Sequence, residues 1–389
     1  KYKSQLSRQL SYIHKIPRNN FIWSTILDSW LFHVLSIIVI NFEKNKKKKI
    51  FIKDNLNYDY VINHSIELFE KEKINYISSL VDNQFNKNNN IKSDFKFVEK
   101  RKNIFYLNNL LNFFIRLFIF IRKPILITDA YFCFKDRIKF FLISYGKILI
   151  LSSGAAFNDN IKSKVTQNEL RTTIKVKEQD NIDKVFNILL KNTLPKNYLE
   201  NFEEYLNESN FYFKNLKILG SAINIHTSDF YKILASRMLS NRKQVLGFQH
   251  GYGYNFTNNN ITEKIEKRNC SKYFYWNDRK GLGLNYLNRF KKLKKINYFK
   301  NKKIYFLPDT LETEFYYFDY FLLYRDFNVK KRKQNHLELC NNIKQKKLLN
   351  IKCFRKEEKD YDYLKKKGYK LVINKRIDKI LSETKLLIS

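Results

Sequence analysis

The chain has 389 residues, 44% of them hydrophobic, so it is long enough for two domains and too apolar for an intrinsically disordered protein. Its 74 Lys and Arg residues exceed its 37 Asp and Glu residues, which gives a formal net charge of +37 at pH 7. This excess of positive charge suggests nucleic acid or an anionic membrane as a partner. An AT-rich genome is an alternative explanation for the excess, because Lys, Asn, Ile, Phe and Tyr are all abundant while Gly and Met are scarce.

The N-terminal part of the chain predicts helices. We expect a basic helix over 1–14 and an aromatic core helix over 107–121. The stretch 21–42 is almost apolar enough for a transmembrane span, but polar residues interrupt it at about helical spacing, namely Ser24, Thr25, Asp28, Ser29 and His33. We interpret it as a buried helix, with an interfacial helix as the alternative. The basic run 44–49 after it suits an anionic membrane surface or, equally, a solvated loop.

Two apolar stretches then predict strands that end in polar residues. The first, 125–131, ends near Asp129, and the second, 147–151, runs into Ser152-Ser153-Gly154. Asp129 is a candidate for a binding cleft; alternatively, it caps the next helix. Ser153 does not have the Gly-x-Ser-x-Gly surroundings of an esterase nucleophile. Helical periodicity over 159–213 predicts helices that pack on the sheet.

A βαβ unit is predicted between Lys217 and Phe248. Residues 217–223 and 245–248 form its apolar strands, and 228–239 forms its helix, with Thr227 or Ser228 as the cap and Asp229 in the first turn. One face of this helix is apolar: Phe230, Ile233, Leu234 and Met238. The two strands of such a unit are parallel.

The loop after the second strand is the centre of the candidate site. Three of the nine glycines of the chain lie close together here, at Gly247, Gly251 and Gly253. Ligands of open parallel sheets bind outside the carboxyl ends of the strands. We therefore expect His226 and His250 on one rim, near a helix N-terminus that can receive an anion. The alternative is that His250 only holds a turn.

The remaining residues predict a second alternating α/β domain. We place the domain crossing between 261 and 270, so that the first domain covers 1–265 and the second covers 270–389. Strands are expected at 272–276, 303–307, 348–353, 370–373 and 384–388. Asp309 follows one of them and is a further candidate for the cleft. Because the chain stops after the last strand, we expect the second domain to be incomplete, and because residue 1 is Lys, we expect residues before it.

No metal or disulfide site is predicted. The cysteines are scattered, at Cys133, Cys270, Cys340 and Cys353, without metal-ligand spacing, and predict reduced thiols in a cytoplasmic protein. No signal peptide is recognisable. The string Asp360-Tyr361-Asp362 has the composition of a divalent-cation site, but it lies in a lysine-rich segment, and we interpret it as solvent-facing.

The loop sequence resembles that of a known group of proteins. Gln249-His250-Gly251, followed by Tyr252-Gly253-Tyr254, is similar to the Gln-His-Gly-Gly-x-Tyr-Gly loop of transferases of bacterial surface-carbohydrate biosynthesis. The similarity extends to Ser271–Trp276 and to the Trp-containing segment 21–35, and is thin between 41 and 218. The Gln-His-Gly turn also occurs in capsule sugar transferases of the two-domain GT-B type.

This resemblance implies an α/β fold with two Rossmann-like domains of GT-B type, the first on the acceptor side and the second on the donor side. It implies a glycosyl- or sugar-phosphate transferase of capsule or lipopolysaccharide synthesis. A nucleotide sugar is its donor substrate, a glycan or lipid-linked molecule is its acceptor, and no separate cofactor is expected. The expected location is the cytoplasm, with possible contact to the inner face of the membrane. In the family, a polar loop after the last strand holds the donor, and the chain ends where that loop begins.

The resemblance also suggests roles for residues. His250 is the candidate general base or phosphate contact, because an imidazole with a pKa of about 6.5 can do either. The other candidates for binding substrate are Gln249, Gly251, Gly253, His226, Ser228 and Asp129, with Asp309 and Arg325 as weaker candidates from the second domain.

Two other classes of function compete with a transferase. A basic nucleic-acid-binding protein fits the charge and the 16% aromatic content, but the lysines are spread along the chain and no nucleic-acid-binding motif is recognisable, so we expect no specific nucleic acid partner. A non-catalytic remnant of a transferase fits the shortened second domain.

Overall fold

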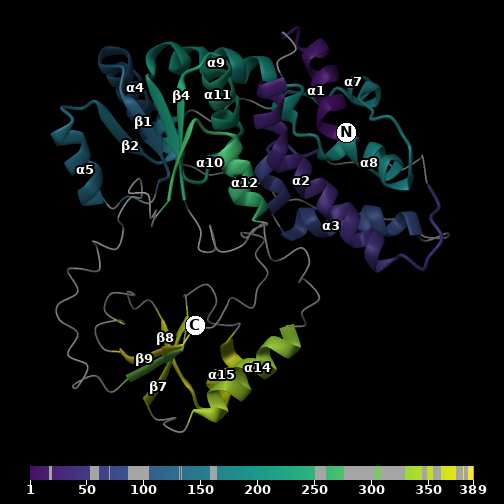
Figure 1. Cartoon of the computed structure of the whole chain (residues 1–389), viewed down its shortest axis with the longest axis vertical. Helices are drawn as coiled ribbons and strands as arrows, with labels where there is room; N and C mark the ends of the chain where they lie inside the picture. Colours follow the sequence, from purple (N-terminus) through teal and green to yellow (C-terminus); the bar gives the residue numbers. More distant parts are fainter. Residues whose placement is uncertain are drawn as a thin grey trace. The chain divides into compact units, whose positions relative to one another are not determined.

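The structure is a computed structural model, and it describes residues 1–16, 20–52, 61–69, 71–85, 105–130, 132, 134–157, 164–249, 260–275, 303–306, 329–343, 348–353, 361–373, 380 and 384–388. The chain divides into two compact units, Lys1–Tyr275 and Trp276–Ser389. Each unit contains a parallel β-sheet with helices, so the protein has the α/β fold that the sequence predicts (Figure 1).

The first unit begins with helices. These are α1 (Tyr2–Ile13), α2 (Asn20–Lys44), η1 (Ser65–Phe69), α3 (Lys71–Asp82), η2 (Asn83–Phe85) and α4 (Phe105–Arg122). The predicted basic helix at the start of the chain is confirmed by α1. Its Leu6 and Leu10, at helical spacing, are both fully buried.

Helix α2 is the buried helix that the sequence predicts. Trp23, Ile26 and Trp30 are fully buried. The indole N–H of Trp23 donates to Ser11 Oγ at 2.8 Å, and that of Trp30 donates to the carbonyl oxygen of Thr193. Among the helices in the described ranges, α2 alone is long and apolar enough to cross a membrane, yet 67% of its most apolar window is buried within the protein. Its apolar side chains are therefore used in the core of the first unit.

The sheet of the first unit has five parallel strands in the order β2-β1-β3-β4-β5. The strands are β1 (Ile125–Thr128), β2 (Ile148–Leu151), β3 (Ile218–Ser221), β4 (Gln244–Phe248) and β5 (Lys272–Phe274). Each confirms a strand predicted from the sequence, but β5 was expected in the second domain and instead pairs with β4 in the first sheet. The register pairs Thr128 with both Leu151 and Ser221, so the carboxyl ends of β1, β2 and β3 are level with one another.

Helices connect these strands and cover the sheet. They are α5 (Phe134–Ile143), α6 (Ser153–Ala156), α7 (Asn168–Thr173), α8 (Asn181–Thr193), η3 (Lys196–Tyr198), α9 (Phe202–Asn215), α10 (Asn224–Thr227), α11 (Asp229–Ser240) and α12 (Ile261–Arg268). The predicted βαβ unit is confirmed, because α11 joins the parallel strands β3 and β4. Ser228 caps α11 by accepting the backbone N–H of Tyr231 at 3.2 Å. The predicted apolar face of α11 is fully buried.

Helix α4 differs from its prediction as a core helix. Ile115 and Ile119 are buried, but most other apolar side chains of its described part are exposed: Phe113, Phe114, Leu117, Phe120 and Ile121. The reason is its position. The helix packs on the first unit with one face only, and its sequence is apolar on the opposite face as well, so periodicity alone assigns it to the core.

The second unit contains a four-stranded parallel sheet in the order β8-β7-β6-β9. Its strands are β6 (Lys303–Phe306), β7 (Leu349–Cys353), β8 (Lys370–Ile373) and β9 (Thr384–Ile388), and all four were predicted. Its described helices are α14 (Val329–Asn342) and α15 (Asp362–Lys366). A small core of buried side chains joins them: Ile304, Phe306, Cys340, Leu349, Ile351, Tyr361, Leu364 and Tyr369.

Candidate functional site

Both sheets contain a point where the order of the strands reverses. In the first sheet, β2 lies on one side of β1, and β3, β4 and β5 follow on the other side. In the second sheet, β7 and β8 lie on one side of β6, and β9 lies on the other. Ligands of open parallel sheets bind at such reversals, outside the carboxyl ends of the strands. The geometry therefore directs attention to the residues that follow β1 and β3, which we call the carboxyl edge of the first sheet.

A buried network of hydroxyl and amide groups forms this edge. Asn224 Nδ2 donates to Thr128 Oγ1 at 2.7 Å, which ties the end of β1 to the start of α10. Ser221 Oγ accepts the backbone N–H of Asn224 at 3.0 Å, so β3 turns directly into α10. Each of these side chains is at most 5% exposed. The network fixes the backbone on both sides of the reversal.

Asp129 has an unusual backbone conformation at this edge. Its φ is +47°, in the left-handed region, where Asp is one of the few side chains that occur with any frequency. Its carboxylate accepts the backbone N–H of Ser153 at 2.9 Å, at the start of α6. The carboxylate therefore holds the turn after β2 and does not cap α5, the helix that follows it in sequence. Non-glycine residues in this region are concentrated at functional sites.

His226 lies at the same end of the sheet but inside the protein. It is 2% exposed, its Nε2 is 3.0 Å from Glu266 Oε1, and its Nδ1 is 3.4 Å from Ser29 Oγ. Glu266 also accepts the hydroxyl of Tyr273 at 2.5 Å. The imidazole–carboxylate pair thereby links α10, α12, α2 and β5 behind the carboxyl edge. In this position His226 can hold the residues of the carboxyl edge in place. Its contact with a ligand stays a prediction.

Ser228 and Gln249 are the other predicted site residues that the structure describes. Ser228 is buried, and its hydroxyl caps α11. Gln249 follows β4, is 7% exposed, and donates its backbone N–H to the carbonyl of Phe274 at 2.9 Å. His250, Gly251, Gly253, Asp309 and Arg325 lie outside the described residues. Asp129, Ser228, His226 and Gln249 thus come from the ends of three neighbouring strands, β1, β3 and β4.

The first turn of α11 carries a buried ion pair that sequence reasoning missed. Lys232 Nζ lies 3.2 Å from Asp229 Oδ1, 2.5 Å from Ser65 Oγ and 3.1 Å from the hydroxyl of Tyr198. Asp229 also accepts Asn197 Nδ2 at 3.0 Å. A spacing of three residues between opposite charges at a helix start is the only signal in the sequence, and most such pairs are exposed.

The ionisation of this cluster follows from its burial and its charges. Burial alone would raise the pKa of Asp229, but Lys232, His64 and the hydrogen bonds of Ser65 overcome it and hold the pKa at about 2. Burial lowers the pKa of Lys232, and the carboxylate of Asp229 opposes this effect. Burial and the neighbouring Asp229 raise the pKa of Tyr198 well above its usual value. Asp229 is therefore an anion at neutral pH.

His64 is the half-exposed member of this cluster. Its side chain is 42% exposed, its Nδ1 is 3.9 Å from Asp229 Oδ2, and Asn197 Nδ2 lies 2.7 Å from the same nitrogen. Asn197 and Asp229 thus lie against one side of the imidazole, and its other side is open to water. The residues before it, Asn57 to Asn63, give no sequence signal for this position.

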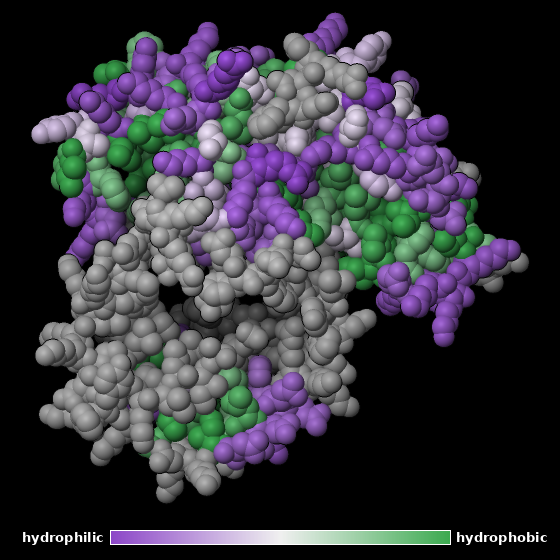
Figure 2. All heavy atoms as spheres, viewed as in Figure 1, coloured by the Kyte–Doolittle hydropathy of each residue, from purple (hydrophilic) through white to green (hydrophobic). Residues whose placement is uncertain are grey.

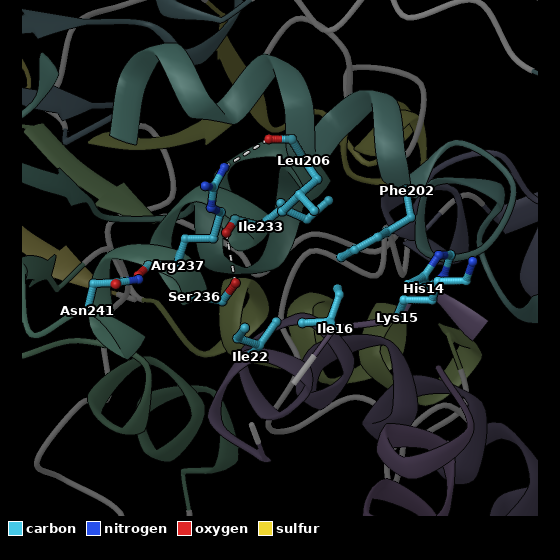
Figure 3. Close-up of a pocket in the computed structure, with 10 residues that line it drawn as sticks. All are labelled: His14, Lys15, Ile16, Ile22, Phe202, Leu206, Ile233, Ser236, Arg237 and Asn241. Atoms are coloured by element: carbon cyan, nitrogen blue, oxygen red, sulfur yellow. Dashed lines mark hydrogen bonds between the residues drawn. The ribbon is translucent and has the colours of Figure 1, made fainter. Parts of the chain in front are cut away.

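A pocket of about 330 Å³ lies at the other end of α11, away from the carboxyl edge (Figure 3). Apolar side chains from α2, α9 and α11 line it, together with His14, Ser236, Arg237 and Asn241. The side chains of His14, Ser236, Arg237 and Asn241 already hydrogen-bond within the protein. Arg237 donates to the carbonyl of Leu206 at 2.9 Å, and Ser236 donates to the carbonyl of Ile233 at 2.7 Å. We therefore place the candidate site at the carboxyl edge and not in this pocket.

Metal-binding geometry is not found among the described residues, where no three His, Cys, Asp or Glu side chains gather in a way that could hold an ion. The chemistry that the described part of the carboxyl edge offers is therefore that of a carboxylate, Asp129, beside hydroxyl, amide and backbone N–H groups. Groups of this kind can orient and hydrogen-bond a polar ligand. Gln249 follows β4 at this same edge, and the rest of the loop to Tyr254 lies outside the described residues.

Comparison with known proteins assigns the chain to a class of enzymes. The sequence model of a family described as LIC12162 family transferase matches residues 1–389, which includes both units. Neither a curated protein nor a solved structure matches the chain. The family match therefore supports a transferase, and the strand order of the first sheet supports the position of the candidate site.

Proposed function

The chain belongs to the LIC12162 family of transferases, and from this premise we propose that it is a glycosyl- or sugar-phosphate transferase of GT-B type. The donor is a nucleotide sugar, and the acceptor is a glycan or lipid-linked molecule of surface polysaccharide synthesis. The observation that carries this proposal is the presence of two open parallel sheets in one transferase chain, each with a reversal of strand order. Such reversals are where α/β sheets bind nucleotides and other phosphorylated ligands.

In this proposal the two sheets have different tasks. The order β8-β7-β6-β9 is that of the first four strands of a nucleotide-binding Rossmann sheet, in which the reversal lies between the first and fourth strands in sequence. We assign the donor to the carboxyl ends of β6 and β9. We assign the acceptor to the carboxyl edge of the first sheet, where Asp129 and Gln249 are located.

The reaction that we propose needs a base and a site for the leaving phosphate. The base removes a proton from the acceptor hydroxyl while the bond between the sugar and the nucleotide phosphate breaks. His250 is our candidate, as base or as a contact to the phosphate, because its imidazole titrates near neutral pH. Gln249, Gly251 and Gly253 orient the substrate in this proposal, with Asp309 on the donor side. We propose the cytoplasm as the location of the enzyme, because nucleotide sugars are its substrates.

The experiment that tests this function measures donor binding and turnover in the same preparation. The purified chain is titrated calorimetrically with uridine-, guanosine-, cytidine- and thymidine-linked sugars, and release of the nucleotide is followed by chromatography. We expect one class of nucleotide sugar to bind and to be hydrolysed slowly without an acceptor. If none binds at millimolar concentration, the proposed donor chemistry is wrong.

Variants of His250 then test its role. His250→Ala and His250→Gln should lower nucleotide release by about 100- to 10,000-fold, the usual contribution of a general acid or base, without a change in melting temperature. His14→Gln is the matched control, because His14 lies in the remote pocket. Unchanged turnover in both His250 variants would remove His250 from the mechanism and leave the transferase assignment intact.

A further inference from the structure

The outer face of α4 and α5 carries an unusually apolar surface for a chain of this charge. Figure 2 shows hydrophobic side chains at the surface on the left of the first unit, over the region where Figure 1 places α4 and α5, with hydrophilic side chains next to them. Helix α5 has no buried residue, although six of its ten residues are Phe, Ile or Leu. The exposed apolar residues of this face are Phe113, Phe114, Leu117, Phe120, Ile121, Phe134, Ile138, Phe140, Phe141, Leu142 and Ile143.

These residues belong to one surface and not to two separate helices. The rings of Phe118 and Phe141 lie with their centres 5.6 Å apart, which joins α4 to α5. Gly146, between α5 and β2, brings the chain close to both rings, since a Cβ there would lie 3.0 Å from Phe118 and 3.6 Å from Phe141. We call this surface the α4–α5 face.

The exposure is large for individual side chains. Phe120 is 60% exposed, Ile143 is 66% exposed and Phe134 is 76% exposed. Single exposed apolar side chains are common on soluble proteins, but contiguous groups of aromatic and aliphatic side chains mark a surface that binds a protein or a membrane. The α4–α5 face is therefore a candidate surface for binding a protein or a membrane.

Basic residues surround the same face. Arg122, Lys123, Lys135, Lys139 and Lys147 are exposed, and none of them forms an ion pair with another described residue. Asp136 is the only acidic residue in the sequences of the two helices. Long basic side chains can cover apolar surface with their methylene groups and keep their charges at the height of lipid headgroups. Aromatic and aliphatic side chains with Lys and Arg beside them are the composition of interfacial helices.

The basic residues of the α4–α5 face favour an anionic lipid surface over a second copy of this chain as its binding partner. A second copy of this chain has the same basic residues and a formal net charge of +37, so two α4–α5 faces would repel each other. An anionic lipid surface attracts the basic residues and accepts the apolar ones. We propose that the α4–α5 face is a membrane-docking surface, and that it binds the surface of a bilayer that contains anionic lipids.

The basic run 44–49 is less suitable for this role. Lys46, Lys47, Lys48 and Lys49 are exposed, but the helix before them, α2, uses its apolar side chains in the core. The apolar residues that follow these lysines, Ile50, Phe51 and Ile52, are partly buried, so lipids would bind here mainly through charge. Salt screens this attraction within about 8 to 10 Å. The α4–α5 face combines both kinds of attraction.

The face is also connected to the candidate site. Phe132 packs on Phe140 of α5 at 5.4 Å and on Phe248, the last residue of β4, at 6.1 Å between ring centres. Gln249 follows Phe248 directly. Docking would therefore hold the carboxyl edge close to the bilayer surface, where a lipid-linked acceptor is found. This link to the acceptor rests on the proposed function, whereas membrane binding itself does not.

The test is binding of the whole chain to vesicles, measured by flotation at physiological salt. One set of vesicles is phosphatidylcholine alone, and the other contains equal parts of phosphatidylcholine and phosphatidylglycerol. We expect binding to the anionic vesicles to be at least about tenfold stronger, because each basic residue near such a surface adds to the attraction. No enzymatic activity is measured, so failure of the sugar chemistry does not affect the result.

Paired variants separate the two attractions. Phe120→Glu with Leu142→Glu, and Lys135→Glu with Lys139→Glu, should each weaken binding by about tenfold or more without a change in melting temperature, since all four side chains are exposed. Lys366→Glu with Lys367→Glu in the second unit gives the same change in net charge as the second pair and should have a much smaller effect. Tyr12→Glu, at a side chain that is 87% exposed on α1, is the apolar control.

Three results would overturn the proposal. The first is that the wild-type chain does not bind the anionic vesicles. The second is that the two pairs of Lys→Glu substitutions weaken binding equally while the Phe120 and Leu142 substitutions have no effect. That result would mean that the chain adsorbs to the vesicles through its net charge alone. The third is self-association of the wild-type chain that the Phe120 and Leu142 changes abolish, without vesicle binding, which would assign the face to a second copy.

Discussion

Lys232 and Asp229 form an ion pair of 3.2 Å at the start of α11, and neither side chain reaches solvent. The pair sits where the chain leaves the carboxyl edge of the first sheet. Around it, Ser65 and Tyr198 bring η1 and η3 to the same point, so three segments distant in sequence are joined by charge-assisted hydrogen bonds. Removal of one charge of the pair leaves the other charge buried and unpaired, a cost that the loss of an apolar contact does not have.

Removal of either partner of this pair should strongly destabilise the protein. Lys232→Met leaves a buried carboxylate, and Asp229→Asn leaves a buried ammonium, so we expect each to cost about 3 to 5 kcal/mol of the free energy of unfolding. The measurement is chemical denaturation followed by circular dichroism. The double variant should lose less than the sum of the two single losses, because no unpaired charge remains in it.

An exposed ion pair provides the control for this prediction. Lys164 and Glu204 have side chains that are 42% and 39% exposed, so Lys164→Ala should cost less than about 1 kcal/mol. A loss below about 1 kcal/mol for Lys232→Met and Asp229→Asn as well would contradict the buried and charged state of the Asp229–Lys232 pair.

Acid should remove the stabilisation that Asp229 contributes. Its pKa is about 2 in the folded protein against a usual value of 3.8. Because the folded pKa is the lower one, the contribution is fully present above about pH 4 and is lost as the pH falls through 2, with a total of about 2 kcal/mol. The free energy of unfolding should therefore decrease more steeply between pH 4 and pH 2 in the wild type than in Asp229→Asn. Parallel curves for the two proteins would refute this assignment.

The strands were predictable from the sequence because each is a short apolar run bounded by polar or turn residues. The run Ile125 to Thr128, for example, contains only Ile, Leu and Thr between a proline and an aspartate. Burial of α2 was also predictable, because its polar residues recur at helical spacing, which a lipid-facing helix would not favour. These are local signals, and they required no knowledge of tertiary contacts.

The missed features all depend on contacts between distant segments. The spacing of Asp229 and Lys232 predicts an ordinary pair on the surface of a helix. In the structure, η1 and η3 cover this pair. His226 was placed on a rim because it follows a strand, but α12 and α2 enclose it through Glu266 and Ser29. In α4, a second apolar face was assigned to the core because the sequence does not reveal that only one face of the helix is covered.

Gly247 should be intolerant of a side chain, and the reason is packing. A Cβ there would lie 2.5 Å from Tyr273 Cδ2 and 3.1 Å from Cys270 Sγ, so the Tyr273 ring or strand β5 itself must shift. We expect Gly247→Ala to cost about 1 to 3 kcal/mol of the free energy of unfolding, the usual range for overpacking. Gly154→Ala is the matched control, because a Cβ at Gly154 has no neighbour within 4 Å and alanine favours the helix. Equal stability of both variants in thermal and chemical denaturation would contradict the close contact of β4 and β5.

Asp129 allows its two possible roles to be separated by one substitution. Asparagine tolerates the left-handed φ of +47° and keeps an oxygen that can accept the N–H of Ser153, so Asp129→Asn should change the free energy of unfolding by less than about 1 kcal/mol. If the carboxylate contacts the acceptor in the proposed reaction, the loss of its charge should lower transfer by about 100-fold or more.

Asp129→Ala completes this comparison. Alanine removes the acceptor for Ser153 and is strained at positive φ, so this variant should be destabilised by about 1 to 3 kcal/mol whatever the role of the charge. Thermal melting and nucleotide release are measured for both variants and the wild type. A stable and inactive Asp129→Asn assigns the carboxylate to the reaction. A stable and fully active Asp129→Asn limits Asp129 to holding the turn between β2 and α6, and the acceptor site must then be sought along the loops that follow β3 and β4.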